Sequence, residues 1–93
     1  MLEKAIEAKL RAVVKIMGGK ALKLTCPGTA GMPDRMLIFP EGRIYFIEVK
    51  KEGQKLKALQ HIRLDWLNRM GFNARVISSL EQVDEFAKEL MLT

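Results

Sequence analysis

Residues 31–51, "GMPDRMLIFPEGRIYFIEVKK", constrain the fold of this chain more than any other stretch. Two runs of apolar, β-branched and aromatic residues, at 36–39 and 44–49, have the composition of β-strands. Between them, the Pro-Glu-Gly sequence at 40–42 suits a three-residue turn in which Gly42 takes the left-handed conformation. The segment is therefore predicted to form a β-hairpin.

The length of the turn decides which side chains face one another across the hairpin. A three-residue turn pairs Phe39 with Arg43, and the same register places Asp34 directly opposite Glu48. Directly opposed residues share a face of the sheet, with Cβ atoms about 5 Å apart, and Lys50 falls on that face by strand alternation. A two-residue turn would move Asp34 to the other face unless a bulge compensated. The turn chemistry favours the register that brings the three charged groups together.

This cluster has a chemical interpretation and a simpler structural one. Two carboxylates so close together repel, and in an apolar setting one of them tends to take up a proton. A divalent cation relieves the repulsion, and two acids, a backbone carbonyl and water suit Mg²⁺ or Mn²⁺. Lys50 beside such an ion could orient an attacking water or offset charge developing on a phosphate. The alternative is an ion pair at the sheet edge; the opposed Asp34 favours the catalytic interpretation.

Hydrophobic periodicity and turn signals divide the rest of the chain into three helices and two further strands. In chain order we expect a helix over 2–17, a strand over 20–25, a loop over 26–33, the hairpin, a helix over about 55–70, a strand over 73–77 and a helix over about 80–91. This αβββαβα order predicts an α/β fold with a parallel strand–helix–strand unit, in a mixed sheet flanked by helices on both faces.

Size and composition limit the function classes. The 93 residues suffice for one domain, spanning 1–93, and not for two. No stretch approaches the ~18 uninterrupted apolar residues of a membrane span, and the N-terminus lacks the apolar region of a signal peptide. Cys26 has no cysteine to pair with, which is consistent with a reducing, cytoplasmic environment. The net charge of +5 favours an anionic partner such as nucleic acid, although many small proteins are basic without one.

The motif pair resembles a known group of enzymes. "PD" followed across the hairpin by "EVK" resembles the PD-(D/E)XK nuclease superfamily. More specifically, "GMPDRMLIFPEGRIYFIEVKKEG", with "LKALQ" and "GFNARVISSLEQVDEF", resembles stand-alone, phage-type members of its VRR-NUC (virus-type replication-repair nuclease) branch. The likeness covers nearly the whole chain. It implies a restriction-endonuclease-like αβββαβ core with a C-terminal helix, encoded by a bacterium or a phage.

The resemblance also implies an activity and roles for individual residues. It predicts a Mg²⁺-dependent DNA endonuclease, with Mn²⁺ as a substitute, that leaves a 5′-phosphate and a 3′-hydroxyl. By likeness, Asp34 and Glu48 hold the metal, Lys50 is catalytic, and Gln60 in the next helix supports the site. Branched DNA, especially the four-way (Holliday) junction, is the expected substrate. One domain carries one site, so cutting two strands symmetrically requires a homodimer. "CPG" at 26–28 departs from the expected serine before Pro-Gly.

Helical periodicity places Gln60 and Arg63 against an apolar stripe. The predicted buried stripe of the second long helix consists of Leu56, Leu59, Ile62, Trp66, Leu67 and Met70. Gln60 falls on its edge and Arg63 in its middle. Both side chains either serve the site, as a bond to a catalytic group or a DNA phosphate, or reach past the core to solvent. His61 points away from the stripe and is expected to be exposed.

Further site residues come from the first helix and from the basic side chains. Glu7 lies on the border of that helix's apolar stripe and, with the resemblance, is expected to join the metal site; Glu3 is expected to lie on a solvated face. The carbonyl of Val49 is the expected backbone ligand. The expected phosphate contacts are Lys23, Arg35, Lys51 and Arg63.

Three other functions remain open at this point. The chain could be a basic DNA-binding module without catalysis, a nicking or flap nuclease that does not resolve junctions, or a structural subunit in which the charged cluster is an ion pair. Metal-dependent cleavage that requires Lys50 separates the enzyme from the others.

Overall fold

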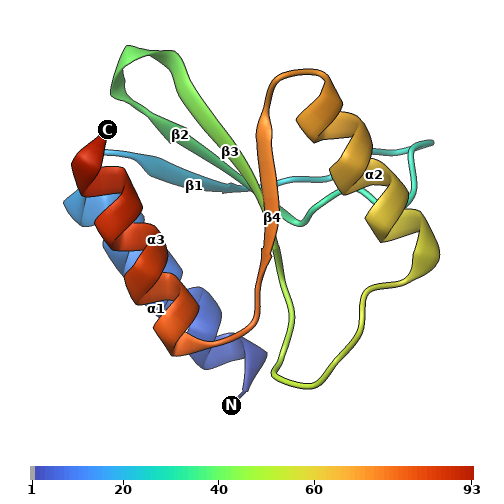
Figure 1. The fold of residues 1–93 in the computed structure, drawn as a ribbon, viewed down its shortest axis with the longest axis horizontal. Helices are drawn as coiled ribbons and strands as arrows, with labels where there is room; N and C mark the ends of the chain where they lie inside the picture. The colour runs from blue at the N-terminus through green and yellow to red at the C-terminus, as the bar shows by residue number, and fades with distance from the viewer. Residues whose placement is uncertain (1) are drawn as a thin grey trace.

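The computed structural model describes residues 2–93 (Figure 1). Its elements are α1 (Glu3–Ile16), β1 (Lys20–Lys23), β2 (Arg35–Phe39), the one-turn 3-10 helix η1 (Pro40–Gly42), β3 (Arg43–Val49), α2 (Ala58–Arg69), β4 (Asn73–Ile77) and α3 (Leu80–Leu92). The αβββαβα order is confirmed. Within residues 2–93, no helix has the length and apolar character needed to cross a membrane.

The four strands form one mixed sheet in the order β1-β2-β3-β4. β2 pairs antiparallel with β1 and with β3, whereas β3 and β4 are parallel and are joined through α2. Helices α1 and α3 lie side by side on one face of the sheet, and α2 lies on the other (Figure 1). The prediction of a mixed sheet with helices on both faces is therefore confirmed.

The hairpin has the predicted register. Phe39 pairs with Arg43 and Arg35 with Ile47, across a three-residue turn. Gly42 takes a positive φ of 75°, and Glu41 takes one of 69°, which is unusual for a residue with a side chain. Because side chains alternate along a strand, this register fixes which residues face α1 and α3 and which face α2.

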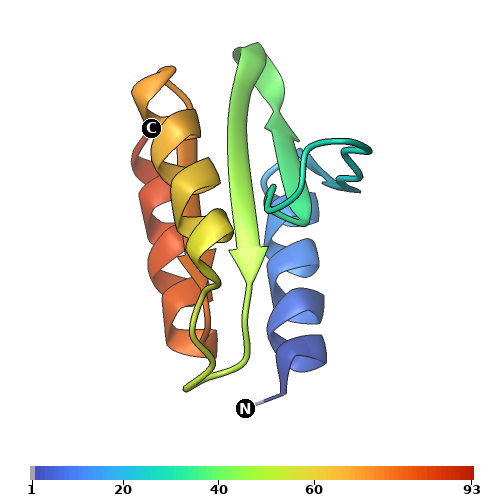
Figure 2. The same ribbon diagram turned by 90° about the vertical axis from the view of Figure 1, so that its right-hand side faces the viewer.

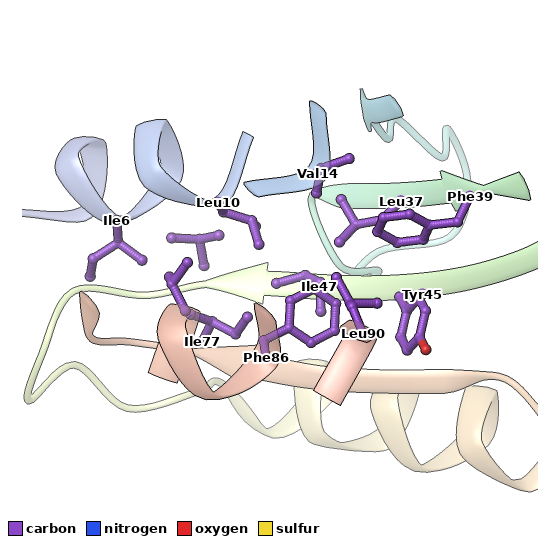
Figure 3. Close-up of a cluster of buried hydrophobic side chains, with 12 residues drawn as sticks. Ile6, Leu10, Val14, Leu37, Phe39, Tyr45, Ile47, Ile77, Phe86 and Leu90 are labelled. Carbon is purple, nitrogen blue, oxygen red and sulfur yellow. The ribbon is translucent and has the colours of Figure 1, made fainter. Parts of the chain in front are cut away.

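The larger core fills the space between the sheet and α1 and α3 (Figure 3). Leu37, Phe39, Tyr45 and Ile47 alternate toward it from the hairpin. Tyr45 makes edge-to-face contacts with Phe39 at 5.6 Å and with Phe86 of α3 at 5.2 Å between ring centroids. The cluster consists of Ile6, Leu10, Val14, Leu37, Phe39, Tyr45, Ile47, Val49, Ile77, Val83, Phe86 and Leu90. It holds both ends of the chain against the hairpin.

The smaller core lies under α2, and it corrects the predicted stripe. Leu64 and Leu67 pack against Phe46 and Ala74 of the sheet. Most of the side chains expected to be buried are exposed instead, namely Leu59, Ile62, Trp66 and Met70. The prediction of that buried stripe was wrong because α2 carries apolar residues on two adjacent sides, and periodicity does not tell which side faces the sheet. Leu64 and Leu67 pack against the small Ala74, so the side of α2 that carries these two leucines faces the sheet.

The start of α2 was also predicted too early. The helix begins at Ala58 and not at Lys55, because Gly53 adopts a positive φ of 85° and Lys57 is still extended, with φ −74° and ψ 155°. The side-chain oxygen of Gln60 accepts a hydrogen bond from the Lys57 N–H at 2.8 Å, which caps the helix.

Asn68 fastens α2 to the edge strand β4. Its Nδ2 donates to the carbonyls of Ala74 at 2.8 Å and Leu64 at 3.0 Å, and its Oδ1 accepts from the Ala74 N–H at 2.9 Å. Ala74 is buried, so losing these bonds leaves polar backbone groups without a protein partner. We expect Asn68→Ala to lower the free energy of unfolding by about 1–3 kcal/mol. Urea denaturation measures the effect, and His61→Ala, an exposed change on the same helix, should leave the midpoint nearly unchanged.

Candidate active site

The three charged residues of the hairpin gather at the end of β3, on the face of the sheet that carries α2. Glu48 and Lys50 are 7% and 8% exposed, and they are the buried charged side chains of residues 2–93. Lys50 Nζ lies 3.8 Å from Glu48 Oε2. A buried ammonium and a buried carboxylate are costly, and a site that needs them for chemistry is one reason to keep them.

Asp34 is held across from Glu48 by backbone N–H groups of β3 and of the residue that follows β1. Its Oδ1 accepts from the Val49 N–H at 3.3 Å, and its carbonyl accepts from the Leu24 N–H at 2.9 Å. The buried Pro33 precedes it and fixes the entry of the chain into β2. The predicted clustering of Asp34, Glu48 and Lys50 is thus what the hairpin register produces.

The electrostatics of the pair favour a bound cation. Burial and the neighbouring negative charge of Asp34 raise the pKa of Glu48 from 4.5 to about 7, although Lys50 opposes the shift. Burial also raises the pKa of Asp34; the Val49 N–H opposes this shift and the negative charge of Glu7 adds to it. The negative charge of Asp34 therefore makes Glu48 harder to ionise, and a divalent ion between the two carboxylates removes that cost.

Glu7 of α1 is near enough to Asp34 to raise the pKa of that carboxyl, but its own carboxylate is bound by Arg35. Arg35 donates to its Oε1 from Nε at 2.6 Å and from Nη2 at 2.5 Å. The Arg35 side chain is 15% exposed, so it offers a DNA phosphate less of its guanidinium than the sequence led us to expect. In residues 2–93 no three or more His, Cys, Asp or Glu side chains are grouped closely enough to hold a metal. The donor set formed by Asp34 and Glu48 fits Mg²⁺, which commonly uses one or two carboxylates and keeps several waters.

Gln60 and Arg63 are both half-buried and both support local structure. The Gln60 Oε1 caps α2, as described above, and Arg63 Nε donates to the Ala30 carbonyl at 2.9 Å. Arg63 therefore anchors the loop between β1 and β2, an attachment that the sequence did not reveal. Gly31 in that loop, with φ +87°, is packed so tightly that a Cβ there would lie 2.8 Å from Leu59 Cγ. The glycine was the only sequence signal for this contact.

The remaining basic candidates lie on the surface near the strand ends. Lys23 at the end of β1 and Lys51 directly after Lys50 are exposed. Both keep their ammonium groups in solvent, where a DNA backbone could meet them. His61 is exposed, as predicted, and Cys26 is a half-buried free thiol.

Comparison with known proteins gives this geometry a family. The model of the VRR-NUC domain matches residues 2–81. The chain belongs to the VRR-NUC family. A phage relative, "Putative nuclease p44" of Acyrthosiphon pisum secondary endosymbiont phage 1, is 42% identical over 65 residues, covering 67% of this chain and 70% of the relative.

Solved structures of VRR-NUC domains have the same fold. One, described as "VRR_NUC domain", superposes with a TM-score of 0.87 at 31% identity, over 92% of this chain and 94% of the other. A second, "VRR_NUC domain protein", gives a TM-score of 0.67 at 19% identity, over 99% of this chain and 89% of the other, and at that identity it supports the fold alone. The expected family is therefore confirmed, and with it a nuclease fold for which DNA is the implied substrate.

Proposed function

We propose that this VRR-NUC chain is a metal-dependent, structure-selective endonuclease that hydrolyses phosphodiester bonds in DNA. The observation that carries the proposal is the buried pair Glu48 and Lys50 facing Asp34, with the pKa of Glu48 raised to about 7. A structural ion pair has no need of a second, repelling carboxylate, whereas a cation site does. We propose Mg²⁺ as the ion, with Mn²⁺ as a substitute.

The ligands are assigned by their chemistry. Asp34 and Glu48 supply carboxylate oxygens, and the carbonyl of Val49 supplies the backbone ligand. The Val49 N–H holds Asp34 in place at 3.3 Å, so the same residue would orient one acid and complete the shell. Glu7 contributes directly or through water, and a direct bond requires its carboxylate to give up part of its contact with Arg35.

The rest of the chemistry falls to Lys50 and its neighbours. When bound, the ion supplies Lewis-acid stabilisation of the charge that develops on the phosphate. Lys50 aligns the water that attacks phosphorus and offsets charge on the phosphate oxygens. The P–O3′ bond breaks, which leaves a 5′-phosphate and a 3′-hydroxyl. Gln60 supports this arrangement by fixing the first turn of α2 beside the site.

Binding of DNA is assigned to the basic side chains around the strand ends. Lys23 and Lys51 are free to contact phosphates, and Arg35 and Arg63 are the remaining candidates after their internal contacts with Glu7 and Ala30. Phosphate contacts of this kind give affinity without reading sequence, which suits an enzyme that selects DNA by its shape. We propose branched DNA, such as the four-way junction, as the substrate. A homodimer would supply the two active sites that symmetric cutting requires.

A cleavage assay on defined substrates tests the proposal. End-labelled four-way junction, flap and linear duplex are incubated with the protein at equal concentration, with Mg²⁺, with Mn²⁺ and with EDTA. We expect cleavage only with metal, fastest on the junction, at symmetric positions on two opposite strands. Metal-dependent nicks in the flap or duplex, without paired cuts in the junction, would indicate a nicking or flap nuclease that does not resolve junctions. Retention of DNA without any cutting would indicate a binding module and contradict the proposal.

A further inference from the structure

The charged side chains of this protein are distributed unevenly between its two flanks. Residues 2–23, which contain α1 and β1, carry six basic side chains and two acidic ones, whereas α3 carries four acidic side chains and one basic one. Figure 2 shows α1 to the right of β3 and α3 to its left. One flank of the molecule is therefore positive and the other negative, so a polyanion is attracted to the flank formed by α1 and β1.

A groove lined by three basic side chains lies between α1 and the edge strand β1. Its lining residues are Arg11, Val14, Lys15, Gly19, Lys20 and Ala21. Arg11 and Lys15 are one turn apart, so they lie on the same side of α1. Arg11, Lys15 and Lys20 are exposed, whereas Val14 belongs to the larger core. The three charged groups therefore border the groove from two different elements.

The turn between α1 and β1 brings these charges together. Gly18 takes a positive φ of 79°, and its N–H donates to the Lys15 carbonyl at 3.1 Å. A Cβ at Gly19 would lie 2.5 Å from the Cδ1 of Phe39, so only glycine permits the chain to pass so close to the sheet. The fold thus holds Lys15 and Lys20 beside one groove although their charges repel.

The three basic side chains have no acidic partner among residues 2–93. The ion pairs of these residues are Lys9–Asp84, Arg35–Glu7, Lys50–Glu48 and Arg75–Glu89. Isolated basic side chains on a surface are often unpaired, but Arg11, Lys15 and Lys20 line a single groove. Neighbouring cations repel one another, and a row of phosphates relieves that repulsion. The groove therefore has the charge and the exposure that a nucleic acid backbone requires.

Strand β1 connects the groove to the candidate active site. Lys20 begins the strand and Lys23 ends it, so the two are about 10 Å apart along the strand. Lys23 pairs with Arg35, which directly follows Asp34. A DNA backbone that contacts Lys23 near the site can therefore reach the groove after about three further nucleotides.

The groove and the candidate active site lie on different faces of the sheet. Val14 and Ala21 line the groove and pack in the larger core, on the face that carries α1. Glu48 alternates with the core residues Ile47 and Val49, so it lies on the opposite face. Duplex DNA is stiff over tens of base pairs, so one straight duplex does not follow both faces. The arms of a branched DNA leave the branch point in different directions and can follow both.

We propose that the groove of Arg11, Lys15 and Lys20 binds the phosphate backbone of a second arm of a branched DNA whose first arm lies at the active site. This inference rests on the proposed function and gives the selection of branched DNA a surface. Contacts of this kind position the DNA without reading its sequence. Selectivity then comes from the number of arms that the protein contacts at one time.

Equilibrium binding without cleavage tests the groove. The groove contains no proposed metal ligand, so its contribution should appear in EDTA. We expect Arg11→Gln/Lys15→Gln to raise the Kd for a four-way junction at least about tenfold, and to lower the slope of log affinity against log salt by about two, because two phosphate contacts are lost. Arg69→Gln/Lys88→Gln removes one exposed arginine and one exposed lysine from α2 and α3. This matched control should change the Kd less than about threefold.

A linear duplex of the same total length tests the second arm. Because one duplex occupies only one of the two faces, Arg11→Gln/Lys15→Gln should weaken its binding less than about threefold. Equal losses on junction and duplex would overturn the second-arm assignment. Equal losses in the double variant and its matched control would show that only the net charge matters, which also overturns it. Circular dichroism melting establishes that both variants are folded.

The outcomes separate this inference from the proposed function. A wild-type protein that binds the junction through Arg11 and Lys15 but does not cut it with Mg²⁺ or Mn²⁺ supports the groove and contradicts the nuclease. A protein that cuts the junction while Arg11→Gln/Lys15→Gln leaves its Kd and its salt dependence unchanged overturns the groove alone. Absence of junction binding by the wild type in EDTA also overturns the groove.

Discussion

Replacing Lys50 with methionine is expected to reduce DNA cleavage by about 10²–10⁴-fold while a divalent ion still binds at Asp34 and Glu48. Methionine keeps the volume of the buried side chain, which is 8% exposed, and removes only the ammonium group. The lost group is the one assigned to align water and to stabilise charge on the phosphate. The loss should therefore fall on the rate of the chemical step and spare the binding of DNA.

The assay for Lys50→Met requires a controlled pH and a neighbouring control. Lys50 lowers the pKa of Glu48, so its removal raises that pKa further and weakens metal binding near neutrality. Single-turnover cleavage should therefore be measured at pH 8.5 with saturating Mg²⁺. Lys51→Met removes an exposed charge one residue away and should change the rate less than about tenfold. Equal losses in the two variants would show that Lys50 contributes only general positive charge.

Replacing Glu48 with glutamine is expected to stabilise the metal-free protein at high pH and to abolish its activity. The folded-state pKa of Glu48 is raised from 4.5 to about 7, so the folded protein holds a proton that the unfolded chain releases between those two pH values. Ionisation of Glu48 thus has no effect on the free energy of unfolding below pH 4.5. It lowers that free energy progressively as the pH rises from 4.5 to about 7, and the loss is complete above pH 7. Glutamine avoids that penalty, which is on the order of 2–3 kcal/mol.

Denaturation at several pH values measures this difference. In EDTA, Glu48→Gln should match the wild type at pH 4.5 and exceed it at pH 8, whereas the exposed change Glu52→Gln should follow the wild type throughout. Adding Mg²⁺ at pH 8 should stabilise the wild type and not Glu48→Gln, because only an intact site gains free energy from the ion. A variant that is less stable than the wild type at every pH would contradict the account of a strained carboxylate pair.

The hairpin could be predicted from sequence because its determinants are local. Turn length, the glycine at 42 and alternation along β2 and β3 fix the register, and the register alone places Asp34 opposite Glu48. No contact from elsewhere in the fold is needed for this step. The clustering of Asp34, Glu48 and Lys50 could be predicted for the same reason.

The side of α2 that faces the sheet could not be predicted, because it depends on the residues of the sheet against which the helix packs. Leu64 and Leu67 pack against Ala74, and Asn68 forms hydrogen bonds with the backbone of β4. The hydrophobic periodicity of the helix predicts none of these contacts. Trp66 was consequently included in the predicted buried stripe, as core filling or as a subunit contact.

The hydrogen-bond and ion-pair partners of long polar side chains could not be predicted from the sequence either. Arg35, which the sequence predicts to contact DNA, also holds Glu7, and Arg63 donates to a loop carbonyl more than thirty residues away in sequence. Several partners lie within reach of such side chains, and only the three-dimensional arrangement selects one. The sequence indicated the acids of the proposed site, and the structure supplied the contacts that position their neighbours.

Calorimetric titration of Mn²⁺ into the metal-free protein at pH 8 tests most directly whether Asp34 and Glu48 form one cation site. We expect saturable binding of Mn²⁺ by the wild type, and at least a tenfold loss of affinity in both Asp34→Asn and Glu48→Gln. The exposed control Glu52→Gln should bind as the wild type does. Absence of binding by the wild type, or binding that survives both substitutions, would contradict the account.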